Sequence, residues 1–218
     1  MKTFCILVIG IAIISTCFSQ HSVDASDAQK DYETGMSRFN AMDYVEALNY
    51  FLKAANQENA QAQVLLGQMY YYGQGVPKDY AEAERWFHKA ANQGNADAQT
   101  FLGVMYSKSP DMPRDYTTAI KWFLKAANQG SDKAQVALGL MYQEGLGVNK
   151  DFAESAKWYL RAANQGRPDA QRELRLMCYF GQGVTEDIIE AKDWFEKAAE
   201  QGDEVALAMK RKLTDVEY

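Results

Sequence analysis

Residues 86–106 read WFHKAANQGNADAQTFLGVMY, and nearly the same text returns at residues 122–142 (WFLKAANQGSDKAQVALGLMY) and 158–178 (WYLRAANQGRPDAQRELRLMC). The step between copies is 36 residues. All four tryptophans of the chain keep this step, and so does one methionine per copy: Trp86, Trp122, Trp158 and Trp194, with Met69, Met105, Met141 and Met177. A fixed step of this length indicates a repeat protein, in which each copy is one small structural unit.

Each copy is expected to contain two helices. In the first helix, apolar residues recur at helical spacing along one face: Ala98, Phe101, Leu102 and Met105. The second helix is expected to begin after an aspartate: Asp43, Asp79, Asp115, Asp151 and Asp187. A glutamate follows three residues after four of these, which predicts a capping box whose glutamate reaches back to the cap N–H. The second helix is expected to end at a glycine: Gly94, Gly130, Gly166 and Gly202.

A glycine also lies inside the first helix, at Gly67, Gly103 and Gly139. Glycine there costs about 1 kcal/mol relative to alanine, so we expect a compensating close approach of the partner helix, whose Ala-Ala pair is also small. Arg175 occupies this position in the last copy. Its long side chain predicts either a splayed helix pair or an arginine that extends past the last helix to water.

No single helix pair can bury its own apolar face. Stacking of neighbouring pairs buries it, which predicts an elongated helical solenoid with the tryptophans and methionines in its core.

The pattern Leu-Gly-x-Met-Tyr, then Gly-x-Gly-Val, then Trp-Phe/Tyr-x-Lys/Arg-Ala-Ala-x-Gln-Gly resembles the Sel-1-like repeat, a relative of the tetratricopeptide repeat. The resemblance covers roughly residues 28–202, and the first copy looks more like a plain tetratricopeptide repeat because its loop is four residues shorter. It implies an all-α, right-handed α-α solenoid of about five helix-turn-helix repeats with a C-terminal capping helix. It also implies an adaptor of a kind often exported from bacteria. Cysteine-rich secreted members of the family are linked to weak penicillin binding, but this chain lacks their paired cysteines.

The first residues read as a secretory signal. Met1 and Lys2 precede an apolar run, Phe4–Ile14, that is too short to span a bilayer comfortably. Cleavage is expected between Ser19 and Gln20, with lipidation of Cys17 as the minor alternative. The mature chain has no second apolar run of spanning length. We therefore expect a secreted or periplasmic monomer without a membrane span.

These features give the expected division of the chain. It consists of a signal peptide (1–19), a leader (20–27), a tetratricopeptide-like repeat (28–58), Sel-1-like repeats (59–94, 95–130, 131–166 and 167–202) and a capping helix (203–218).

Composition excludes several kinds of function. The net charge is −6, which argues against nucleic-acid binding. After signal cleavage only Cys178 remains of the three cysteines, so no internal disulfide is expected. His88 stands at a variable position, no Ser-x-x-Lys motif occurs, and no cluster of metal ligands is visible. We therefore predict no catalytic residue, no cofactor and no metal.

Two loop features remain open to a functional reading. The Gly-x-Gly stretches, such as Gly73–Gly75, could suggest a phosphate loop. They link helix to helix without a preceding strand, which favours simple turns. The loop from Ser109 to Pro113 replaces one of them and is either a drifted turn or a distinct contact loop.

The first helices are expected to line a concave surface. Carried over from the tetratricopeptide resemblance, the candidate groove residues are Tyr32, Phe39, Val64, Gln68, Tyr71, Tyr72, Thr100, Val104, Val136, Leu140, Arg172, Tyr179 and Phe180. The alternative for each is packing between repeats. Exposed aromatic side chains favour binding, since they often anchor interfaces. The sequence thus predicts a non-catalytic, exported scaffold that binds a peptide or an envelope or host protein. The alternative is a cell-wall-ligand-binding protein or a weak β-lactamase-like enzyme.

Overall fold

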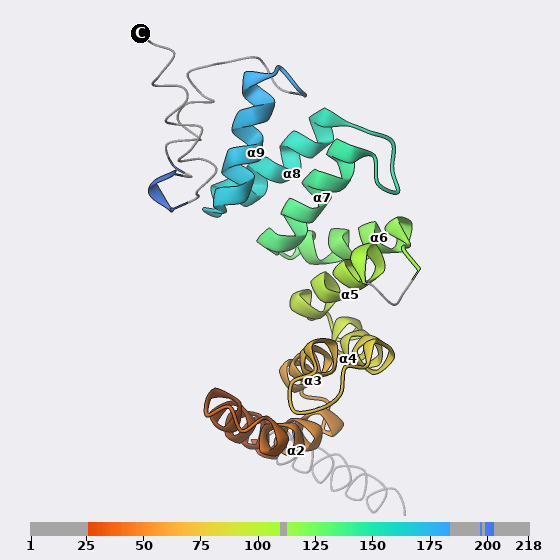
Figure 1. Cartoon of the computed structure of the whole chain (residues 1–218), viewed down its shortest axis with the longest axis vertical. Coiled ribbons are helices and arrows are strands. Elements are labelled where there is room, and N and C mark those ends of the chain that lie inside the picture. The colour runs from red at the N-terminus through yellow and green to blue at the C-terminus, as the bar shows by residue number, and fades with distance from the viewer. Residues whose placement is uncertain (1–25, 110–112, 184–196, 198, 203–218) are drawn as a thin grey trace, which may run out of the picture. The chain divides into compact units, whose positions relative to one another are not determined.

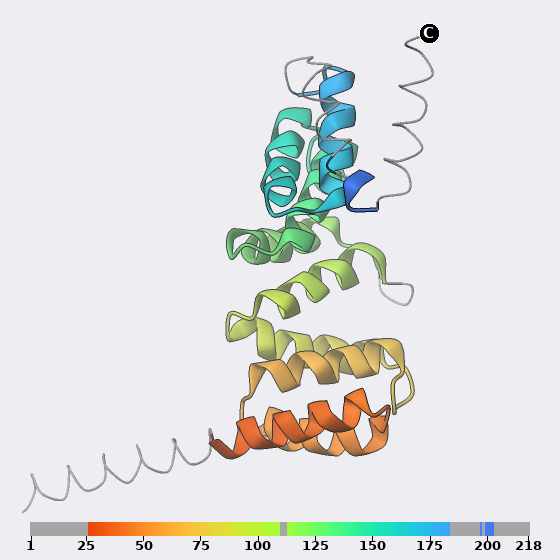
Figure 2. The ribbon, with the colours of Figure 1, turned by 90° about the vertical axis from the view of Figure 1, so that its left-hand side faces the viewer.

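The computed structural model describes residues 26–109, 113–183, 197 and 199–202. Every regular element in this part of the chain is a helix (Figures 1 and 2). The expected signal peptide, most of the leader and the expected capping helix lie outside the described residues.

The helices follow the predicted alternation of first and second helices. They are a helix over residues 26–40, α2 (Tyr44–Asn56), α3 (Ala60–Tyr72), α4 (Tyr80–Asn92), α5 (Ala96–Lys108), α6 (Tyr116–Asn128), α7 (Asp132–Glu144), α8 (Phe152–Asn164) and α9 (Pro168–Tyr179). The prediction of an all-α fold of consecutive helix pairs is therefore confirmed.

The chain divides into two compact units, residues 1–98 and residues 99–218. In the N-terminal unit, α2 packs on α3 and α3 on α4. In the C-terminal unit, α6 packs on α7, α7 on α8 and α8 on α9. Within each unit the consecutive helices run as antiparallel neighbours (Figures 1 and 2).

Trp86 and Trp158 each join one repeat to the one before it. Trp86 is 6% exposed and belongs to a core made with α2 and α3, such as Phe51 and Leu66. Trp158 is 5% exposed and belongs to the core made by α6 and α7. The repeated methionines are also buried: Met69, Met105, Met141 and Met177. The core assignment is confirmed for these residues, whereas Trp122 is half-buried and Trp194 lies outside the described residues.

A cation covers each described tryptophan ring. Lys89 Nζ lies 3.9 Å from the Trp86 ring centroid, and Lys125 Nζ lies 4.1 Å from that of Trp122. The Arg161 guanidinium lies 4.4 Å from the Trp158 centroid. This contact explains the basic residue three positions after each tryptophan, because a cation is attracted to the face of an indole ring.

The glycine inside each first helix faces an aromatic ring. A Cβ atom on Gly67 would lie 2.5 Å from Phe87, one on Gly103 2.6 Å from Phe123, and one on Gly139 2.7 Å from Tyr159. The close approach of the partner helix is thus confirmed, and the nearest atoms belong to an aromatic ring rather than to the Ala-Ala pair. The aromatic residue directly after each tryptophan occupies the space, because its side chain reaches farther across the helix pair than an alanine methyl can.

The aspartate caps are confirmed, but the reciprocal half of the capping box is not. Asp79 Oδ1 accepts the Glu82 N–H at 2.9 Å, and the same bond forms at Asp115 and Asp151. The N–H of each cap donates instead to a carbonyl of the preceding helix, at 2.8–3.0 Å: Tyr70 O, Tyr106 O and Tyr142 O. The glutamate has no cap N–H to satisfy, and the Glu82 carboxylate pairs with Arg85.

Arg175 differs from its expectation. Its side chain is buried, with 2% of its surface exposed. An arginine that extends to water would be largely exposed, so that interpretation is wrong.

Candidate protein-binding surface

A buried glutamine connects each first helix to its neighbours. In the C-terminal unit, Gln135 Nε2 donates to Ala127 O at 3.2 Å, at the end of the preceding repeat. Its Oε1 accepts from Gln165 Nε2 at 2.8 Å, at the end of its own repeat. Gln135 is 4% exposed, so both contacts replace water and hold the first helix at a fixed position.

This pair of hydrogen bonds made by one buried glutamine, here called the glutamine clasp, recurs along the chain. Gln63 makes the same pair of contacts with Ala55 O (3.1 Å) and Gln93 (2.8 Å), and Gln171 makes them with Ala163 O (3.2 Å) and Gln201 (3.4 Å). Sequence reasoning noted the glutamine before each turn glycine but missed its partner. The signal was available, because an Ala-Gln pair begins the buried face of each first helix at 62–63, 98–99, 134–135 and 170–171.

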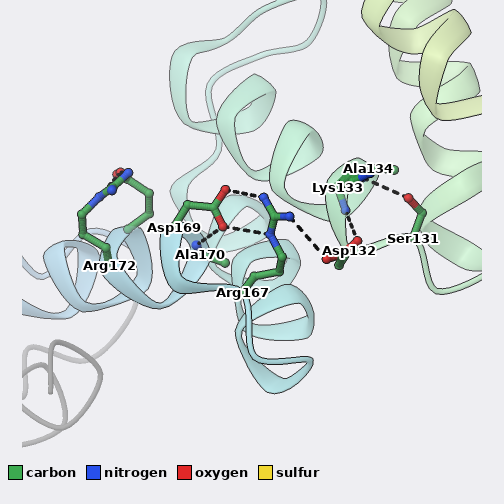
Figure 3. A network of polar contacts seen from close by, with 9 residues as sticks. Ser131, Asp132, Lys133, Ala134, Arg167, Asp169, Ala170 and Arg172 are labelled. Atoms are coloured by element: carbon green, nitrogen blue, oxygen red, sulfur yellow. Dashed lines mark hydrogen bonds and ion pairs between the residues drawn. The ribbon is translucent and has the colours of Figure 1, made fainter. Parts of the chain in front are cut away.

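Polar contacts also join the starts of successive first helices. Asn95 Nδ2 donates to Gln61 Oε1 at 3.4 Å, and the hydroxyls of Thr100 and Ser131 lie 3.0 Å apart. At the next step Arg167 contacts Asp132 at 3.5 Å and Asp169 at 2.7 Å (Figure 3).

Arg167 stands where the helix cap would be. Ser131 accepts the Ala134 N–H at the equivalent position, at 3.3 Å, whereas an arginine cannot accept. Asp169 Oδ1 accepts the Ala170 N–H at 2.9 Å, and Arg167 holds that carboxylate in place (Figure 3). The α7 and α9 starts are therefore tied by charge.

This ion pair predicts a pH dependence of stability. Burial alone would raise the pKa of the Asp169 carboxyl, but the hydrogen bonds and charge of Arg167 outweigh burial and lower this pKa. A lowered pKa in the folded state adds stability above the unfolded pKa of about 3.9, and this stability is lost as the pH falls through the folded pKa. We expect Asp169→Asn to lower the free energy of unfolding at pH 7 by about 0.2–1 kcal/mol.

The difference between the wild type and Asp169→Asn should shrink on acidification from pH 5 to pH 2, as measured by urea unfolding. Arg167→Gln removes the same pair from the other side and should give the same reduced pH dependence. Parallel stability curves for wild type and both variants across this range would rule the ion pair out as the cause.

The structure places twelve of the thirteen candidate groove residues in three classes. Three are exposed, with exposed fractions of 52% (Tyr72), 48% (Leu140) and 62% (Phe180). Seven are half-buried: Tyr32, Phe39, Gln68, Tyr71, Val104, Val136 and Arg172. Val64 and Thr100 are buried, with exposed fractions of 4% and 7%, and the side chain of Tyr179 lies outside the described part.

Several candidates pack inside the protein rather than facing a partner. Val64 and Thr100 are too buried to touch a partner, so their placement on the groove is corrected. The ring centroids of Tyr32 and Phe39 each lie 6.2 Å from that of Phe51 in the N-terminal core. Val104 and Val136 likewise contact core clusters of the C-terminal unit. Helical spacing from the glycine does not separate these faces, because neighbouring repeats cover part of each first helix.

Tyr71, Tyr72 and Tyr80 form an aromatic cluster at the end of α3 and the start of α4. The Tyr71 ring centroid lies 5.0 Å from that of Tyr72 and 5.1 Å from that of Tyr80, with interplanar angles of 82° and 77°. These edge-to-face contacts are favourable and restrict the rings. Burial raises the pKa of Tyr71, and the neighbouring Tyr72 and Tyr80 raise it further. The three rings therefore form one ordered apolar surface that stays partly open.

Within residues 26–109, 113–183, 197 and 199–202, no three His, Cys, Asp or Glu side chains could hold a metal ion together. His88 Nε2 lies 3.6 Å from Glu84 on the same helix. None of the helices in the described ranges is long and apolar enough to cross a bilayer.

The stacked helix pairs and their repeated clasp define an α-solenoid repeat protein. The Sel1 repeat family model matches residues 32–59, 60–95, 96–131, 132–166 and 168–203. The chain belongs to the Sel1 repeat family, as its motifs predicted. Proteins of this family are in general scaffolds for protein–protein interaction.

Solved structures agree with this assignment. A protective antigen present in uropathogenic Escherichia coli strains, with an SLR fold, is 39% identical at a TM-score of 0.79, over 82% of this chain and 39% of that one. A Sel1 repeat protein from Oxalobacter formigenes is 35% identical at a TM-score of 0.77, over 83% of this chain and 72% of that one. Cysteine-rich protein B of Helicobacter pylori shares only the fold, at 24% identity and a TM-score of 0.50, over 61% of this chain and 95% of that one.

The chain spans about two fifths of the length of the Escherichia coli protein. A comparison with curated proteins gives no match.

Proposed function

We propose that this protein is an exported, non-catalytic scaffold that binds a protein partner through exposed side chains of its first helices. One observation carries the proposal. Tyr72, Leu140 and Phe180 are large apolar residues with about half or more of their surface exposed, and all three stand at positions predicted to face a partner. They come from three different repeats, whereas apolar positions that repeat from copy to copy, such as the four methionines, are buried.

These side chains offer a partner a favourable contact. Burying a large apolar side chain contributes about 1.5–3 kcal/mol. Aromatic anchors supported by a rigid framework are also typical of residues that dominate binding energy. The glutamine clasps supply such a framework, because they fix the first helices that carry these residues.

A capture experiment tests the binding function. The purified protein is used as bait against the cell envelope and culture fluid of its source, with chemical crosslinking and mass spectrometry. We expect a partner that is captured by the wild type and lost with Tyr72→Ala or Leu140→Ala. Leu160→Ala is the matched control, since Leu160 is 42% exposed but lies on the second helix α8.

The two kinds of variant separate the outcomes. Loss with the first-helix variants and retention with Leu160→Ala supports the proposed surface, provided that all variants melt like the wild type. Equal capture by every variant places binding elsewhere on the molecule. Absence of any specific partner contradicts the scaffold function.

The proposed export rests on residues 1–19 and is tested separately. The basic start and short apolar run are typical of a secretory signal. The Escherichia coli relative is a protective antigen, and we take this as support for an exported location of the present protein. We expect the mature protein to be a monomer that begins at Gln20 and is recovered from the periplasm or the culture fluid.

Intact-mass measurement and fractionation decide the export prediction. A mass that retains residues 1–19 in the cytoplasmic fraction contradicts it. A mass that corresponds to a lipid-modified Cys17 supports the lipoprotein alternative instead.

A further inference from the structure

The aromatic cluster of Tyr71, Tyr72 and Tyr80 differs in what covers it from the five rings of the fold that lie under a cation. Five other rings lie under a cation supplied by the chain itself: Tyr50 under Lys53, Trp86 under Lys89, Trp122 under Lys125, Phe152 under Lys150 and Trp158 under Arg161. Among the described residues, no cation lies over any ring of the tyrosine cluster. The most exposed of its rings, Tyr72, is 52% exposed.

The charge around this cluster favours a cation as well. The described N-terminal unit, residues 26–98, contains ten acidic and six basic residues, a net charge of −4. Asp79 and Glu82 belong to the start of α4, which also supplies Tyr80. The Glu82 carboxylate pairs with Arg85, and the side chain of Lys78 lies beside Gly73, so the negative balance is that of the whole unit. The negative charge of Asp79 and Glu82 reaches the neighbouring helix, α3. Burial is the largest cause of the raised pKa of Tyr70 on that helix, and the charges of Glu82 and Asp79 raise this pKa further.

We propose that the Tyr71–Tyr72–Tyr80 cluster binds an arginine- or lysine-containing segment of the partner protein, with the partner's cation on the exposed face of Tyr72. The ring face carries the negative end of its quadrupole, and the net negative charge of the N-terminal unit adds to the attraction. The edge-to-face contacts of Tyr72 with Tyr71 keep its ring in place before the partner arrives, which lowers the entropic penalty of binding. This inference rests on the proposed scaffold function and names the chemistry of one of its contacts.

Three peptides that differ only at three side chains test the proposal. The probe is a fluorescein-labelled nonapeptide with three arginines separated by glycine and proline. The first comparison peptide carries citrulline in place of each arginine, which keeps the shape and removes the charge. The second carries glutamate. Binding to the purified protein is measured by fluorescence anisotropy at low salt.

We expect the arginine peptide to bind more tightly than the citrulline peptide, and the glutamate peptide not to bind. A cation on an aromatic face contributes from about 0.5 to about 2 kcal/mol, so Tyr72→Leu should weaken the arginine peptide by about twofold to thirtyfold. Tyr72→Phe keeps the ring and should bind like the wild type. Because Leu replaces the ring by another apolar side chain, Tyr72→Leu should leave the weak binding of the citrulline peptide nearly unchanged.

Several results would overturn the proposal. They are equal binding of the arginine and citrulline peptides by the wild type, an equal loss of both with Tyr72→Leu, or no binding of the arginine peptide at millimolar concentration. Unchanged melting of Tyr72→Leu shows that a loss is not caused by unfolding. Capture of a partner through Leu140 without arginine-peptide binding leaves the scaffold function standing and removes only this site.

Discussion

Trp158→Ala is expected to lower the free energy of unfolding by about 3–5 kcal/mol, the range found when a large buried aromatic side chain is removed. Trp158 is 5% exposed, and its ring packs on Ile120 and Phe123 of α6 and on Leu138 and Met141 of α7. The substitution opens a cavity where one repeat meets the preceding one, and it also removes the contact between Arg161 and the ring. Urea unfolding followed by far-ultraviolet circular dichroism measures the loss.

Leu160→Ala is the control for this substitution. It shortens a side chain on the same helix that is 42% exposed, and exposed substitutions usually change stability by about 0.5 kcal/mol or less. A Trp158→Ala protein that unfolds at the same urea concentration as Leu160→Ala would show that the tryptophan does not belong to the core.

Gly139→Val is expected to destabilise the protein by about 1–3 kcal/mol, the usual range for overpacking a filled core. A Cβ atom at Gly139 would lie 2.7 Å from the Tyr159 ring, and Tyr159 is 1% exposed, so its ring has no open space to move into. Valine is favoured over glycine inside a helix by about 0.4 kcal/mol, which is smaller than the overpacking penalty. Steric conflict should therefore dominate.

Two further variants separate crowding from helix propensity. Leu140→Val introduces the same β-branched side chain at the next position, which is 48% exposed. It should lower the free energy of unfolding by only about a few tenths of a kcal/mol. In a Tyr159→Leu background the Gly139→Val penalty should fall, because a smaller side chain faces the valine. An undiminished penalty in that background would contradict the ring as its cause.

Much of this fold could be predicted because the same motif occurs in several copies that can be compared with one another. Residues that must fit the same space in every copy, such as Trp158 and Met141, keep a step of 36 residues, and their burial follows from that constraint. The aspartate caps and turn glycines could be predicted for the same reason. Gly94, Gly130 and Gly166 have φ angles of 88–94°, which glycine adopts readily.

Sequence reasoning did not determine which side chain meets which. Spacing showed that Gly139 must face something close, but it could not distinguish the Ala-Ala pair from Tyr159, since both lie on the partner helix. The cap N–H was assigned to a glutamate because the local motif offered one, whereas Tyr142 O of another helix takes the bond at Asp151. Such contacts depend on the packing angle between helices, which a one-dimensional pattern does not contain.

The candidate surface was predictable only in part, for a related reason. A first helix has one face toward its own repeat and others toward neighbouring repeats or solvent. Position relative to the central glycine placed Tyr72 and Leu140 correctly among exposed residues but also included Val64, which is buried. Whether such a residue is exposed or buried depends on the side chains that pack between repeats. These include the Gln135 clasp and its equivalents, which the sequence pattern did not predict.

Site-specific photo-crosslinking in the source cell tests the central claim most directly. A photoreactive phenylalanine analogue is placed at position 72, at position 140 or, as control, at position 160, and each protein is shown to melt like the wild type. The proposed binding surface predicts that illumination joins the same partner protein to positions 72 and 140 and not to position 160. Crosslinks from position 160 alone, or equal labelling from all three positions, would contradict a partner bound along the first helices.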